Sequence, residues 1–97
     1  MTEPCKVEKL MSISRAEFLA SLVHIAGVRE TENGMWVVPL DADGSATITF
    51  NKQASVQLGG LLELPRARIT IRLDGGSAEA RATFFQRFDM AFQRGGG

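Results

Sequence analysis

Two segments of the chain, one toward each end, carry apolar residues at helical spacing. In the first, Ser14 is followed three residues later by Glu17, which is the signature of a capping box. Apolar residues then recur at intervals of one, three and four: Phe18, Leu19, Leu22, Val23 and Ala26. The pattern predicts a helix from about Arg15 to Ala26, ended by Gly27.

The second helical pattern follows Ser77, a favourable N-cap residue, and has Glu79 in its first turn, where the helix dipole favours an acid. Its apolar stripe is rich in phenylalanine: Phe84, Phe85, Phe88, Ala91 and Phe92. We expect this helix to run to about Gln93 and the terminal glycines to end it.

The residues between the two predicted helices have the pattern of strands. The strand-forming stretches are Met35–Leu40, Ser45–Asn51, Val56–Leu58 and Arg66–Leu73, and turn residues separate several of them. Whether 61–64 is a strand stays open, because Glu63 and Pro65 interrupt its alternation. Pro65 cannot donate to a ladder, so we expect a bulge or a sheet edge there.

The predicted order is α-β-β-β(-β)-α. Short turns between strands indicate an antiparallel meander, because parallel crossovers need a dozen or more residues. We therefore predict an α+β two-layer sandwich in which an N-terminal and a C-terminal helix pack on one face of a sheet of three or four strands. Residues 1–12 are expected to be a mobile tail, 13–94 a single domain and 95–97 a glycine tail.

Composition narrows the classes of function. The 97 residues suffice for one hydrophobic core, and the balance of eleven basic and eleven acidic side chains argues against a general nucleic-acid binder. One cysteine, one histidine and no tyrosine leave few groups for metal binding or acid–base catalysis. Without a signal-peptide pattern or a membrane-length apolar run, we expect a cytoplasmic, non-enzymatic protein with no cofactor and no metal.

Alternation along one strand places Arg66, Arg68 and Arg72 on the face opposite the helices, beside Thr47 and Thr49. Guanidinium groups form bidentate hydrogen bonds with oxyanions, so this is a candidate face for phosphates, carboxylates or an acidic partner. The alternative is a solvated outer face whose arginines protect an edge strand from aggregation. The face lacks the aromatic platform on which nucleic-acid bases stack.

The C-terminal helix supplies a candidate interface. Its phenylalanine stripe is first of all a core stripe, but its margin has the composition of a protein interface: Phe85, Arg87, Met90, Phe92 and Arg94. Charge is also uneven, because residues 15–63 hold three basic and six acidic side chains and residues 66–94 hold six and three. This split could pair two copies as a homodimer or be neutralised within one fold.

The leading hypothesis is a small protein–protein association module or accessory subunit that acts as a homodimer or on a protein partner. The alternative is a binder of small anionic ligands on the arginine face. The end Arg94-Gly95-Gly96-Gly97 also resembles the diglycine tail of ubiquitin-like modifiers and sulfur carriers. In those families, however, the tail follows a final strand, whereas a helix is predicted here, so a carrier protein is the third reading.

Overall fold

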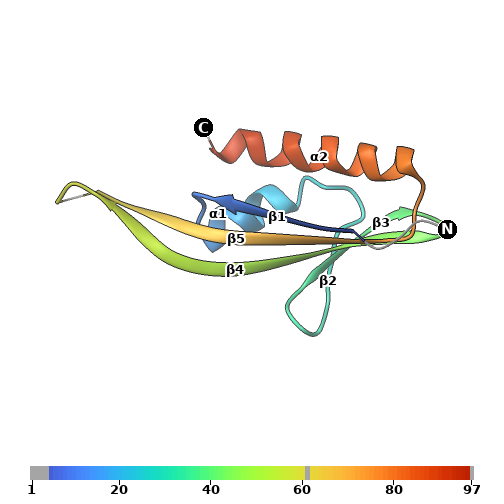
Figure 1. Cartoon of the computed structure of the whole chain (residues 1–97), viewed down its shortest axis with the longest axis horizontal. Coiled ribbons are helices and arrows are strands. Elements are labelled where there is room, and N and C mark those ends of the chain that lie inside the picture. The colour runs from blue at the N-terminus through green and yellow to red at the C-terminus, as the bar shows by residue number, and fades with distance from the viewer. Residues whose placement is uncertain (1–4, 61, 97) are drawn as a thin grey trace.

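The computed structural model describes residues 5–60 and 62–96, with side chains through Gln93. A five-stranded antiparallel sheet of order β1-β5-β4-β3-β2 carries two helices on one face, which confirms the predicted two-layer α+β architecture (Figure 1). Along the chain the elements are β1 (Cys5–Met11), α1 (Arg15–Leu22), β2 (Arg29–Glu30), β3 (Trp36–Asp41), β4 (Gly44–Leu58), β5 (Leu62–Asp74) and α2 (Ala78–Gly96).

β1 corrects the prediction of a mobile tail over residues 1–12, of which 1–4 lie outside the described residues. It pairs antiparallel with β5, from Cys5 opposite Leu73 to Met11 opposite Ala67. Val7 and Met11 pack against the core, while Lys6 and Glu8 alternate with them and are exposed. β1 is an edge strand with a neighbouring strand on one side only, and such strands commonly carry charged residues. These charges interrupt its apolar pattern, so the sequence analysis did not recognise a strand here.

β4 and β5 are longer than the predicted strands and form one continuous hairpin. β5 begins at Leu62, so the open question of residues 61–64 is answered for 62–64, whereas Leu61 lies outside the described residues. The pairing steps from Gln53 opposite Arg66 to Val56 opposite Leu64, which sets two residues of β4 against Pro65 alone. The bulge expected near Pro65 is thus confirmed, and it lies in the partner strand.

The capping box at the start of α1 is confirmed in both directions. The Ser14 Oγ accepts from the Glu17 amide at 3.2 Å, and the Glu17 Oε1 accepts from the Ser14 amide at 3.2 Å. The helix ends at Leu22, a turn earlier than predicted, and turns lead to Gly27 with φ of 82°. Its Phe18 is fully buried and contacts the rings of Trp36, Phe50 and Phe92, which joins both helices to the sheet.

α2 begins as predicted, because the Ser77 Oγ accepts from the Ala80 amide at 3.0 Å. Its apolar stripe is a core stripe: Phe84, Phe88, Ala91 and Phe92 are all buried. The helix continues to Gly96, so the glycines do not form a separate tail up to that residue, and Gly97 lies outside the described residues.

The turn between β3 and β4 packs against the turn that leads into α2. Asp41 carries this contact: its Oδ2 accepts from the Ser77 amide at 3.0 Å and its Oδ1 from the Asp43 amide at 2.9 Å. These backbone donors hold the pKa of the Asp41 carboxyl below its ordinary value. The two turns approach closely at Gly44, where a Cβ atom would lie 2.6 Å from the Gly76 Cα.

Candidate functional site

The outer face of the sheet, on the side away from the helices, brings together all five predicted anion-binding residues. Directly opposed residues of an antiparallel pair share a face. Arg68 and Arg72 of β5 lie opposite Asn51 and Thr47 of β4, and Thr70 lies opposite Thr49. Arg66, opposite Gln53, ends this row at the bulge. The alternation in the sequence therefore placed these side chains on the same face as the strand register does.

Two edge strands add charges to the outer face that the sequence analysis did not place there. β1 contributes Lys6 and Glu8, opposite Arg72 and Thr70, and β2 contributes Arg29 through its pairing with Val37. Lys6 Nζ lies 3.4 Å from a Glu8 carboxylate oxygen, and Arg72 Nε lies 3.3 Å from an Asp74 carboxylate oxygen. Arg68 has no ion pair with any residue that the structure describes, so cationic character remains around it.

The most distinctive surface is the distal part of the β4–β5 hairpin, here called the arm, residues 53–58 and 62–66. β3 pairs with β4 only as far as Ile48, and β1 pairs with β5 only as far as Ala67, so the arm extends past both neighbours. Figure 1 shows it projecting well beyond the helices, in a molecule that measures 51 × 23 × 22 Å.

The arm has one apolar and one polar face. Val56 lies opposite Leu64 and Leu58 opposite Leu62, on the face that continues the row of Arg66 and Arg68, whereas Gln57 and Glu63 share the other face. Leu58 and Leu62 keep 49% and 54% of their surface exposed. The sequence left open whether residues 61–64 form a strand. Residues 62–64 belong to β5, in the arm, where Leu62 is exposed.

The predicted interface on α2 is only partly available as surface. Phe92 is buried at 4% exposure and stacks on Phe88, so it belongs to the core. Phe85 is half-buried and contacts Phe84. Arg87 and Met90 are exposed, Met90 to 67%, and the side chain of Arg94 lies outside the described residues. Met90 and Arg87 line a shallow depression of about 290 Å³ with His24.

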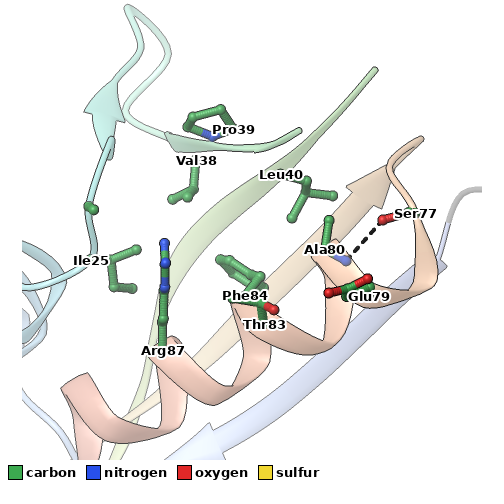
Figure 2. A pocket seen from close by; sticks show the side chains of 11 residues that line it. Ile25, Val38, Pro39, Leu40, Ser77, Glu79, Ala80, Thr83, Phe84 and Arg87 are labelled. Carbon is green, nitrogen blue, oxygen red and sulfur yellow. Dashed lines mark hydrogen bonds between the residues drawn. The ribbon is translucent and has the colours of Figure 1, made fainter. Parts of the chain in front are cut away.

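A second depression, of about 270 Å³, lies between α2 and β3 (Figure 2). Its floor is apolar, with Ile25, Val38 and Phe84, and Glu79 and Arg87 lie toward opposite ends of it. The Ser77 hydroxyl is already engaged by the Ala80 amide. The depression thus combines an apolar floor with one acidic and one basic side chain toward its ends.

Within residues 5–60 and 62–96, no group of three or more His, Cys, Asp or Glu side chains could hold a metal ion. No helix in that part of the chain is long and apolar enough to cross a membrane. No protein-family model, curated protein or solved structure matches the chain. The surfaces described above are therefore the features of this protein that bear on its function.

Proposed function

We propose that this protein is a protein-association module that binds a protein partner through the arm and the adjoining outer face. The observation that carries the proposal is the apolar face of the arm: four aliphatic side chains in two cross-strand pairs, with no element of the described chain over them. Exposed apolar patches on small soluble domains mark interaction sites.

The aliphatic composition of the arm is unfavourable for a surface that stays exposed to water. A two-stranded ribbon is marginally stable without a packing partner, and polar residues on both faces would keep it soluble. Complete burial of a leucine side chain contributes roughly 1.5–3 kcal/mol, so covering the half-exposed Leu58 and Leu62 would yield about 1 kcal/mol each. A partner that covers the arm would thus gain affinity and order the ribbon.

Charge on the outer face favours a partner different from the chain itself. The register gives this face five cationic side chains, Lys6, Arg29, Arg66, Arg68 and Arg72, and two acidic ones, Glu8 and Asp74. A second copy that met this face with its own would oppose like charges, which disfavours association. The expected partner segment carries aliphatic residues for the arm and acidic residues for Arg68.

A pull-down from nuclease-treated lysate of the source cells tests this proposal with three baits: the wild type, Leu62→Asp and Val23→Asp. Val23 is 71% exposed at the end of α1 and serves as the matched control. We expect a saturable partner that the wild type and Val23→Asp retain, that Leu62→Asp loses, and that high salt weakens. Equal capture by Leu62→Asp and the wild type would refute the role of the arm.

Homodimerisation along α2 is the second candidate, favoured by the exposure of Met90 beside Arg87. Light scattering behind size exclusion separates the 10.5 kDa monomer from a dimer of twice that mass. A dimer that Met90→Asp dissociates and Leu62→Asp does not would support this second interface. A wild-type monomer over the whole concentration range would remove it.

A further inference from the structure

A cleft of about 500 Å³ lies where the arm leaves the body of the sheet. It is lined by apolar side chains, hydroxyl groups and cations: Ile13, Phe50 and Pro65; Ser14 and Ser55; Arg15, Lys52 and Arg66. The volume is within the range of small-molecule sites, which combine an apolar surface with a few polar groups. Ser55 is one of the two bulge residues opposite Pro65, so the bulge itself shapes the wall.

The charges that line this cleft have one sign. Arg15, Lys52 and Arg66 come from three different elements or their ends, no acidic side chain is in the lining, and none of the three forms a salt bridge within the described residues. By the strand register Arg66 belongs to the outer-face row and borders the cleft at the bulge, whereas Lys52 lies opposite the buried Ala67, on the helix side with Phe50. The two cations on the helix side, Arg15 and Lys52, repel each other, and a bound anion would relieve that repulsion. The arrangement therefore favours an anionic occupant.

The Glu17 carboxylate, in the capping box at the start of α1, is engaged by a backbone donor. Glu17 is outside the lining, and its Oε1 accepts from the Ser14 amide at 3.2 Å in the capping box. The Ser14 hydroxyl likewise accepts from the Glu17 amide, so the capping box engages the amides of both Ser14 and Glu17. The case for an anion thus depends on the side-chain cations and does not depend on the helix terminus.

One of the cations is held in place by aromatic rings. The Arg15 guanidinium carbon lies 5.5 Å from the ring centroid of Trp36 and 5.8 Å from that of Phe50. Both contacts are within the range of cation–π attraction, which orients the guanidinium without neutralising its charge. Phe50 also lines the cleft, so a cation and an apolar wall are presented together.

We infer that this cleft binds a small organic anion whose oxyanion group meets Arg15 and Lys52 and whose apolar body lies on Ile13, Phe50 and Pro65. Carboxylate and phosphate groups both suit a guanidinium fork and an ammonium. The inference goes beyond the proposed association function and depends on a different set of side chains from the apolar face of the arm.

The test is a titration of the ¹⁵N-labelled full chain followed by ¹H–¹⁵N correlation spectra. The probes are 2-naphthoate, its neutral counterpart 2-naphthamide, and inorganic phosphate, which has the charge without the apolar body. We expect 2-naphthoate to shift the amides of Ser14, Ser55 and Arg66 saturably, with a Kd of about 1 mM or tighter, and the other two probes to bind at least about fivefold more weakly.

Variants then locate the site. Arg15→Gln and Lys52→Gln should each weaken 2-naphthoate binding about threefold to tenfold. Arg68→Gln, two residues further along β5 and outside the cleft, is the matched control and should bind like the wild type. Arg15 and Lys52 are both exposed, so neither substitution removes a buried core side chain.

Three outcomes would overturn the inference: no saturable shift up to about 10 mM 2-naphthoate, equal affinity for 2-naphthamide, or equal weakening by Arg68→Gln and the cleft variants. These outcomes leave the association proposal intact, because its test depends on Leu62 and on a protein partner. Conversely, loss of the arm interaction leaves the cleft and its titration unchanged.

Discussion

Replacing Gly44 with alanine tests the close approach between the β3–β4 turn and the start of α2. A Cβ at Gly44 would lie 2.6 Å from the Gly76 Cα, and closer still to the Gly76 nitrogen and the Gly75 carbonyl carbon. Real Cβ atoms do not approach backbone atoms so closely, and backbone cannot rotate aside as a side chain can. The two turns would have to separate.

The magnitude follows from what that separation disturbs. Overpacking a tight site typically destabilises by about 1–3 kcal/mol, and a contact with backbone alone belongs at the upper end. A loss of about 3 kcal/mol corresponds to a fall in Tm of roughly 12–24 °C for a domain of this size. The Asp41 contact with the Ser77 amide spans the same junction and would lengthen with it.

Thermal and urea unfolding followed by circular dichroism measure this effect, with Gly60→Ala as the control. Gly60 has open space where a Cβ would stand, and its φ is outside the left-handed region. We expect Gly60→Ala to leave stability unchanged or to raise it by up to about 1 kcal/mol through the unfolded state. A Gly44→Ala protein within about 0.5 kcal/mol of the wild type would refute the packing argument.

Two further predictions address β1 and Asp41. Val7→Asp should destabilise the fold by about 2 kcal/mol, because Val7 packs on the core. Leu10→Asp is the control and should be nearly neutral, because Leu10 is 55% exposed on the outer face. Similar urea unfolding midpoints for the two variants would contradict the β1 register. Because the folded-state pKa of Asp41 is lowered, its stabilisation is present above the ordinary value of 3.8 and is lost as pH falls through the lowered value. Tm measured from about pH 6 to about pH 2.5 should therefore fall less steeply in Asp41→Asn than in the wild type, and parallel curves would contradict the assignment.

The elements that the sequence predicts well are those whose signals are local. The capping box at Ser14, the N-cap at Ser77 and the alternation of Arg66–Leu73 each appear as expected. These features depend on residues within a turn or a strand of one another, and the structure does not override them. The packing of both helices on one face follows from their apolar stripes.

β1 and the cleft at the base of the arm were not predicted, because both depend on contacts between distant segments of the chain. In β1, Lys9 lies opposite Ile69, on the face toward the helices. Its Nζ forms a 4.0 Å ion pair with Asp89 of α2. Because a charged residue takes one of the core-facing positions, the strand lacks a simple apolar alternation. The cleft at the base of the arm likewise needs Arg15, Lys52 and Arg66 from three separated segments. No local pattern in the chain reveals either arrangement.

The sheet order determines the sequence in which the strands can pair during synthesis. Strands β2 to β5 are consecutive hairpin partners, so each can pair as soon as its neighbour leaves the ribosome. β1 is synthesised before them all, yet among the described strands it pairs with β5 alone, and closing that long loop is entropically slow. Cys5 and Val7 therefore have no strand partner until β5 has been synthesised, and β1 docks after the β2–β5 hairpins have paired.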